Sequence, residues 1–220
     1  MAEIALLGVG DLHGRINWKD ELAAAARRAD AILVCGDITT FGSVADAATV
    51  LDDLEAYCDT IYAVAGNCDS AAIDNYLAER GISLHGRGLF IGDRIGLCGV
   101  SGSNRTPLKT PLEYTDEELL ATLNRGWQQI ETAPIRIVVH HAPPYKTRCD
   151  RMRLGLHVGA RGLRSFCEEK QPELVLCGHI HEARGRDRIG QTIVVNPGMA
   201  AKGHGSLITI SEDGLEVALL

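Results

Sequence analysis

The sequence predicts an α/β protein, a four-layer α/β/β/α sandwich in which two mixed sheets are flanked by helices. Two observations lead to this prediction. Apolar strand patterns alternate with amphipathic helix patterns through the first half of the chain, which indicates parallel β-α-β units. Short strand patterns separated by tight turns recur in the middle and near the C-terminal end, which indicates additional antiparallel strands.

The first half is expected to hold three parallel strands, each followed by a helix. In chain order these elements cover residues 4–9, 18–28, 31–35, 44–57, 60–65 and 71–80. Asn17 and Ser43 are the expected N-caps of the first two helices, because their side chains can accept hydrogen bonds from free backbone N–H groups.

The middle of the chain predicts an antiparallel hairpin and one further helix. These elements cover residues 89–91, 95–100 and 116–130. The hairpin turn is centred on Asp93, and a loop rich in Ser, Thr and Pro follows over residues 101–111. Thr115 and Glu118 form the capping-box pattern that marks a helix start.

The second half predicts one more strand–helix–strand unit and then antiparallel strands. The unit covers residues 135–139, 160–170 and 174–177, and the terminal strands cover residues 192–196, 206–211 and 215–220. Residues 212–214 are expected to form a hairpin turn. No repeat or Pro/Gly/Ser-rich linker divides the chain, so residues 1–220 are expected to form a single domain.

The composition is that of an ordinary globular protein, with 45% hydrophobic residues and a net charge of −7. This charge argues against stable nucleic-acid binding, which usually depends on a basic surface. No apolar run approaches the roughly 20 residues that span a bilayer, and no signal peptide is recognisable. The seven cysteines include no CxxC pair and are best interpreted as buried thiols, so a cytoplasmic protein is expected. Nothing marks an oligomer interface, and the oligomeric state is left open.

Five polar clusters each follow an apolar strand, and they carry the functional prediction. They are Asp11-Leu12-His13, Gly36-Asp37, Gly66-Asn67-Cys68-Asp69, His140-His141 and Gly178-His179-Ile180-His181. Ligand sites of parallel sheets lie at the carboxyl ends of strands, so the clusters are expected to converge. Asp11 and His13 are separated by one residue, so on an extended strand end both side chains would point to the same side.

The clusters offer seven candidate metal ligands: Asp11, His13, Asp37, Asn67, His141, His179 and His181. Carboxylate oxygens combined with imidazole nitrogens suit divalent Mn, Fe, Zn, Co or Ni. Seven ligands are too many for one tetrahedral ion and fit two ions that share a carboxylate. Such a pair of ions can clamp the attacking and leaving oxygens of a phosphoryl displacement.

In their order and placement, the motifs DxH, GD, GNxD, H and GHxH resemble the calcineurin-like metallophosphoesterase superfamily. The matching motifs run from Asp11 to His181. Within the superfamily the sequence is most similar to small predicted phosphoesterases of the Icc-like group. The resemblance implies the calcineurin-like fold and a hydrolase of small phosphorylated substrates, in which a metal-activated hydroxide attacks the ester. It implies two divalent metal ions, Mn first, with Fe, Zn, Ni, Co or Mg as alternatives.

The resemblance also implies roles for individual residues. The first metal would be bound by Asp11, His13 and His181 and the second by Asn67, His141 and His179, with Asp37 as the bridge. His141 is preferred to His140 because the run His-Ala-Pro-Pro matches the family motif. Asp69 is expected to orient Asn67 or a metal-bound histidine.

Cys68 departs from the family pattern, since many relatives have a histidine there that is thought to protonate the leaving group or hold the phosphate. A thiol is a poor cationic donor, and relatives with cysteine at this position tend to be phosphodiesterases. Phosphodiesters are therefore the preferred substrates. The alternatives are phosphomonoester or nucleotide hydrolysis, and a non-catalytic protein-interaction scaffold of the same fold.

The loop after the fourth cluster holds a local excess of positive charge, with six Lys or Arg residues against one acid over residues 145–164. Arg148 and Arg151 are candidates for phosphate contacts, as is Arg15, and a solvated charged loop is the alternative. His157 is a candidate general acid, with a structural histidine as the alternative. The candidate catalytic residues are Asp37, Asn67, Cys68, His141 and His157.

Overall fold

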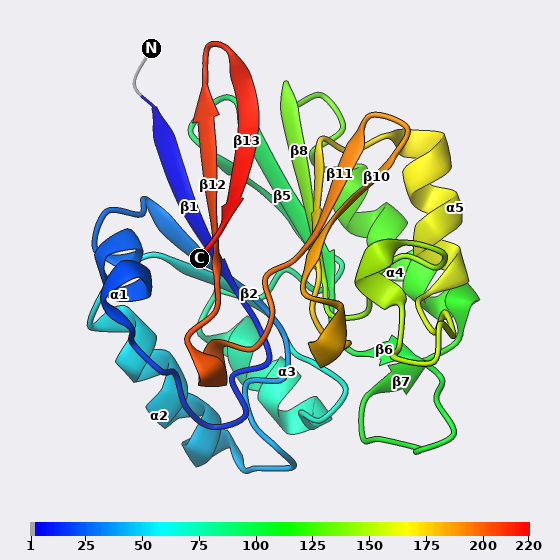
Figure 1. Ribbon diagram of the computed structural model, residues 1–220, viewed down its shortest axis with the longest axis horizontal. Coiled ribbons are helices and arrows are strands. Elements are labelled where there is room, and N and C mark those ends of the chain that lie inside the picture. The colour runs from blue at the N-terminus through cyan, green and yellow to red at the C-terminus, as the bar shows by residue number, and fades with distance from the viewer. Residues whose placement is uncertain (1–2) are drawn as a thin grey trace.

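The computed structural model describes residues 3–220, which form two large mixed sheets. The first sheet has the strand order β13 (Gly214–Leu219), β12 (Ser206–Ser211), β1 (Ile4–Val9), β2 (Ala31–Cys35), β3 (Ile61–Val64). The second has the order β10 (Gly185–Ile189), β11 (Thr192–Asn196), β9 (Leu174–Leu176), β8 (Ile135–His140), β5 (Ile95–Val100), β4 (Gly88–Ile91). Figure 1 shows the two sheets side by side between two groups of helices, so the predicted α/β/β/α sandwich is confirmed.

Within residues 3–220, five α-helices cover the outer faces of the sheets (Figure 1). They are α1 (Asp20–Ala26), α2 (Val44–Glu55) and α3 (Ala71–Glu79) on the first sheet, and α4 (Asp116–Trp127) and α5 (Arg161–Lys170) on the second. Successive strand residues face opposite sides: Leu7 packs in the core under the first helices, and Leu6 packs between the sheets. No helix within residues 3–220 is long and apolar enough to cross a membrane.

The parallel strands bring their carboxyl ends to one edge of the sandwich. In the first sheet β1, β2 and β3 are parallel neighbours, and in the second sheet β5, β8, β9 and β11 are parallel neighbours. The hydrophobic core between the sheets includes Leu33 from β2 and Ile137 from β8, which aligns the two edges. The loops that follow these strands therefore lie close together.

The predicted helix starts are confirmed at two positions and wrong at a third. Ser43 and Thr115 each form a capping box. Asn17 is not an N-cap, since α1 begins at Asp20 with Lys19 before it. The reason is tertiary: the backbone N–H of Asn17 donates to the carbonyl of Ala200, which holds this segment in a loop.

Several strands differ from the prediction. The hairpins β4–β5 and β12–β13 are antiparallel as expected. In contrast, β11 pairs with β9 in parallel, and β10 and the short sheet of β6 (Ser103–Asn104) and β7 (Glu113–Tyr114) were not predicted. Edge strand β10 has the sequence Gly-Arg-Asp-Arg-Ile, so it lacks the apolar run by which a strand is recognised.

Candidate metal centre

The loops after β1 and β2 are joined by backbone hydrogen bonds, which bring Asp11, His13 and Asp37 together. The N–H of Asp11 donates to the carbonyl of Gly36 at 3.0 Å, and the N–H of His13 donates to the carbonyl of Asp37 at 2.9 Å. Because β1 and β2 are parallel neighbours, both loops start from the same edge of the sheet.

Four of the predicted ligands form a tight cluster, in which the ligand atoms of Asp11, His13, Asp37 and His181 all lie within 4.8 Å of one another. The Nε2 atoms of His13 and His181 are 3.1 Å apart, and Nε2 of His181 lies 3.4 Å from Oδ1 of Asp11. Nδ1 of His13 lies 2.8 Å from the Thr40 hydroxyl, which orients the ring and directs Nε2 toward the cluster.

A second group of donors lies near Oδ1 of Asp37, whereas His13 of the first group lies nearer Oδ2. Nε2 of His141 is 3.4 Å from Oδ1 of Asp37 and 2.9 Å from Oδ1 of Asn67. Nδ1 of His141 donates to the carbonyl of Cys35 at 2.9 Å, so Nε2 is the nitrogen available for coordination. The ring of His179 packs 5.0 Å from that of His141, centroid to centroid.

Four of these residues have left-handed backbone conformations. The expectation that Asp11 and His13 lie on an extended strand end, with both side chains on the same side, is therefore wrong. The φ angles are 50° at Asp11, 49° at His13, 49° at Asp37 and 67° at His179. Asp11 and His13 therefore do not continue an extended strand, and tight turns after Val9 aim their side chains instead. Such a conformation costs a non-glycine residue about 1 kcal/mol or more, and this strain is concentrated at functional sites.

The glycines of the motifs leave space for predicted ligands that come from other strands. A Cβ on Gly66 would lie 2.1 Å from Oδ1 of Asp37, and a Cβ on Gly36 would lie 2.5 Å from Nδ1 of His141. Gly36 also has a φ of 95°, which favours glycine. At both positions a side chain would collide with Asp37 or His141, so glycine is required directly before the predicted ligands Asp37 and Asn67.

The buried charges at this site fit divalent cations. Asp11 is fully buried, and its Oδ2 has no hydrogen-bond partner among residues 3–220. A buried carboxylate oxygen without a donor is costly unless a cation neutralises it. Carboxylates, an amide and imidazoles together suit divalent metals of the Mn-to-Zn series, so the residues present match the predicted cofactor.

The imidazoles of the second group respond to their surroundings in opposite ways. Burial disfavours charge on His141, but the carboxylate of Asp37 outweighs burial and raises the pKa of His141 to about 9. Burial and the neighbouring His141 lower the pKa of His179 to about 4. Burial alone would raise the pKa of Asp37, yet its contacts with His141 hold that pKa well below the usual range. The carboxylate of Asp37 thus stabilises a positive charge next to it. A bound cation can supply this charge in place of a protonated His141.

Asp69 holds loop backbone rather than a ligand side chain, which corrects the role expected for it. The carboxylate is fully buried and accepts hydrogen bonds from the N–H groups of Ile38 at 3.0 Å, Thr39 at 2.8 Å and Gly66 at 2.8 Å. It also accepts from the Thr39 hydroxyl at 2.9 Å. Asp69 therefore fixes the loops that follow β2 and β3, and with them the backbone at Asp37.

Cys68 is half-buried next to Asp37, and its thiol is a poor acid. Burial and the nearby carboxylate of Asp37 raise the pKa of this thiol far above its usual range. The backbone N–H of Cys68 donates to Oδ1 of Asp37 at 2.9 Å. Cys68 therefore contributes a backbone hydrogen-bond donor to Asp37, and its thiol stays neutral.

A cavity of about 650 Å³ adjoins the cluster, and Asn67, His179 and His181 are among the residues that line it. His157 lines the same cavity, and its Nδ1 lies 2.6 Å from Oδ1 of Asp150. Asp150 is fully buried and also accepts from the backbone N–H groups of Lys146, Thr147 and Gly159. A buried carboxylate thus fixes one ring nitrogen of His157 and leaves Nε2 available to the cavity.

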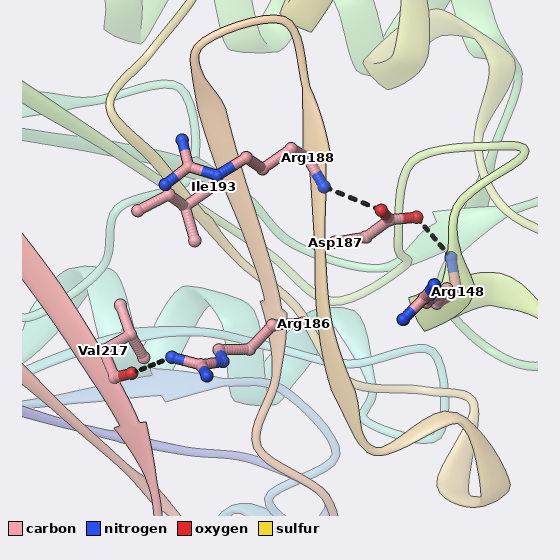
Figure 2. Close-up of a pocket in the computed structure, with 6 residues that line it drawn as sticks. All are labelled: Arg148, Arg186, Asp187, Arg188, Ile193 and Val217. Carbon is pink, nitrogen blue, oxygen red and sulfur yellow. Dashed lines mark hydrogen bonds between the residues drawn. The ribbon is translucent and has the colours of Figure 1, made fainter.

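Arg148 lies at a different place from the one expected for it. It lines a second cavity, of about 510 Å³, along the edge strand β10, together with Arg186 and Arg188 (Figure 2). There the backbone N–H of Arg148 donates to Asp187 at 2.7 Å, and Arg186 donates to the carbonyl of Val217. Arg148 is therefore not brought to the metal-ligand cluster.

Two other arginines line the cavity that adjoins the cluster. They are Arg105 and Arg161. Arg15 and Arg151 are exposed and line neither this cavity nor the one along β10. The guanidinium of Arg161 lies 3.9 Å from the ring centre of Tyr145. Arg161 belongs to the positively charged segment found in the sequence. Arg105 carried no signal beyond its place in the loop over residues 101–111.

A sandwich of this architecture, with carboxylate and histidine side chains gathered at its strand ends, defines a protein of the metallophosphoesterase class. Solved structures share the fold. A Thermus thermophilus protein, TT1561, has a TM-score of 0.71 at 20% identity, with 99% of each chain covered. A dimetal phosphatase from Danio rerio has a TM-score of 0.64 at 11% identity, with 98% of each chain covered. At these identities the likeness shows the fold alone.

The chain belongs to the calcineurin-like phosphoesterase family. The family model described as calcineurin-like phosphoesterase matches residues 4–183. Uncharacterized protein MJ1162 of Methanocaldococcus jannaschii is 36% identical over 200 residues, which cover 87% of each chain. The family expected from the strand-end motifs is thus confirmed.

Proposed function

We propose that this protein hydrolyses phosphodiesters of small molecules with the help of two divalent metal ions, Mn being the first choice. One observation carries the proposal: the buried carboxylate of Asp37 lies between two groups of donors. His13 and His181 belong to one group, and Asn67 and His141 belong to the other. The dimetal phosphatase among the structures of the same fold supports a two-metal centre.

The side chains of this chain would hold such a centre rigidly. Bound there, the cations would polarise the phosphate and acidify the attacking water. His13 is oriented by Thr40 and His141 by the carbonyl of Cys35, so in both rings a contact at Nδ1 directs Nε2 toward the site. Arg161 lines the same cavity as Asn67, His179 and His181, and a guanidinium there can bind a phosphate oxygen through a charge-assisted hydrogen bond.

We infer a preference for diesters from the residue that follows Asn67. A phosphomonoester carries an additional negative charge at neutral pH, and a cationic donor near the phosphate would favour its binding. Cys68 offers a neutral thiol at this position. A diester, with its single charge, is therefore the better match.

Hydrolysis assays with metal-stripped protein test the proposal. Bis-p-nitrophenyl phosphate and p-nitrophenyl phosphate are offered with Mn, Fe, Ni, Co, Zn or Mg added back. The expected result is diester cleavage that depends on the metal and exceeds monoester cleavage. A preference for the monoester would reject the inference from Cys68. The absence of both hydrolysis and metal binding, measured by calorimetry, would favour a non-catalytic scaffold instead.

His157 is the proposed general acid, held by Asp150 on the wall of the cavity. His157→Gln should lower kcat by about 100-fold for a diester with phenol as its leaving group, because phenolate needs a proton to leave. The loss should be much smaller for bis-p-nitrophenyl phosphate, since p-nitrophenolate leaves unprotonated. Equal losses for both esters would assign His157 a positioning role instead.

We further infer that residues 1–220 act as one domain and that the protein is cytoplasmic. The pairing of β12 with β1 supports the first inference, because it joins the C-terminal hairpin to the first strand. The second is supported by the cysteines: all seven are unpaired, as expected in a reducing compartment.

A further inference from the structure

The cavity that adjoins the metal-ligand cluster is larger and more apolar than a phosphate group requires. Its volume of about 650 Å³ lies within the range of cavities that hold drug-sized organic molecules, about 300–1,000 Å³. Beside the polar ligands, the apolar residues that line it are Pro107, Leu108, Met152, Leu156, Val158 and Ile180. A phosphate ester bound at the cluster would therefore have its organic part beside apolar side chains.

Large apolar side chains at this cavity are exposed to solvent. Leu108 is 81% exposed and Leu156 is 62% exposed, and Met152 is 41% exposed. They come from two loops, over residues 104–110 and 151–159, that lie far apart in the sequence. Exposed apolar side chains that gather around a concave surface mark a ligand site, since their burial by a ligand is favourable.

Both loops are held in place by well-bonded polar side chains. Glu113 accepts hydrogen bonds from the backbone N–H and the hydroxyl of both Thr106 and Thr110. The amide of Asn104 donates to the carbonyl of Val158 at 3.2 Å, which ties the two loops together. The walls are thus formed before a ligand arrives, so little ordering entropy opposes binding.

We propose that the substrate is a phosphate ester of an apolar alcohol, with an alkyl chain or an aromatic ring that packs between Leu108 and Leu156. The proposal rests on the proposed function, since it takes the phosphate to bind at the cluster. Arg105 and Arg161 line the same cavity and favour the anionic end of such a molecule.

A small ester is favoured over a macromolecular partner because the apolar side chains surround a cavity that is continuous with the ligands. His179 and His181 line the same space as Leu156. An occupant that places a phosphate at the cluster must fill this cavity with its organic part. Leu154 is 98% exposed and lies outside the cavity. A protein partner with a flat surface would bury Leu154 at least as readily as the leucines that line the cavity.

Binding of phosphonates tests this proposal independently of turnover, because the carbon–phosphorus bond resists hydrolysis. Methylphosphonate, hexylphosphonate and phenylphosphonate are titrated calorimetrically into the Mn-loaded protein. The hexyl and phenyl compounds should bind about tenfold tighter than the methyl compound, as expected for burial of an apolar group. In the double variant Leu108→Ser, Leu156→Ser this ratio should fall to within about threefold. Leu154→Ser is the matched control, from the same loop, and should keep the ratio.

Each other outcome is decisive. Equal affinity for the three phosphonates would overturn the apolar site, even if diesters are cleaved. Selectivity that persists in the double variant would place the apolar group elsewhere and also overturn it. A double variant that changes oligomeric state in size-exclusion chromatography, with selectivity intact, would assign these leucines to an interface between copies. Selectivity without hydrolysis of any ester would support this site and reject the proposed function.

Discussion

Asp37→Asn is expected to abolish metal-dependent ester hydrolysis, with a loss of about 1,000-fold or more in kcat/KM. Metal ions stabilise the transition state by several kcal/mol, and each 1.4 kcal/mol corresponds to about tenfold in rate. Asp37 is almost fully buried, with Oδ1 3.4 Å from Nε2 of His141 and Oδ2 3.8 Å from Nε2 of His13. Asparagine has the same shape but lacks the negative charge, so it cannot bridge two cations.

Metal content and rate are to be measured together on this variant. The metal bound per protein chain, determined by elemental analysis after dialysis, should fall along with diester cleavage. Asp93→Asn is the matched control, because Asp93 lies in an exposed turn between β4 and β5. An Asp37→Asn protein that keeps its metal and more than a tenth of its activity would contradict the bridging role.

The largest effect on stability is expected for Asp69→Ala, which should lower the free energy of unfolding by about 3–5 kcal/mol. The substitution removes a buried acceptor and leaves three backbone N–H groups and the Thr39 hydroxyl without it. Each unsatisfied buried donor costs about 1–3 kcal/mol, and rearrangement or entering water recovers part of the total. For a chain of this size the melting temperature should fall by roughly 10 °C.

Calorimetric unfolding of Asp69→Ala in the presence of a chelator measures this effect without a contribution from bound metal. Asp59→Ala is the matched control, since Asp59 is exposed in the turn before β3. A shift smaller than about 2 °C would show that the loops after β2 and β3 do not depend on this carboxylate. A normal melting temperature with weakened metal binding would likewise reject a structural role for Asp69.

The convergence of the polar clusters could be predicted because it depends on strand order alone. Parallel neighbours end at the same edge, so Asp11, Asp37 and Asn67 meet whatever the detailed conformation of their loops. The conformation itself could not be predicted. The left-handed turns at Asp11 and His13 break the simple alternation of an extended strand. Aspartate and histidine adopt this conformation more often than most residues, but only a small fraction of them do, so their identity does not locate such turns.

Contacts between loops that are distant in the chain likewise could not be predicted from the sequence. In the sequence Asp150 is the one acid of a basic segment, whereas in the structure it is the buried acceptor that holds His157. Arg148 and Arg105 differ little as isolated residues, but they line different cavities. The backbone N–H of Arg148 is held by Asp187 of β10, whereas Arg105 directly follows β6. Side-chain direction in a long loop depends on such tertiary hydrogen bonds, which composition and spacing do not reveal.

The donors at the strand ends come from both halves of the sandwich, and this has a consequence for unfolding. His13 follows the first sheet and His181 follows the second, 168 positions later in the chain, and their Nε2 atoms are 3.1 Å apart. A cation held by both would act as a removable cross-link between the sheets. Because the two histidines are brought together only by folding, the cation would bind the folded chain and not the unfolded one, and it would stabilise the folded state in proportion to the logarithm of free metal concentration. The resistance of this protein to heat and proteases would then depend on the metal supply of its surroundings, and not on its sequence alone.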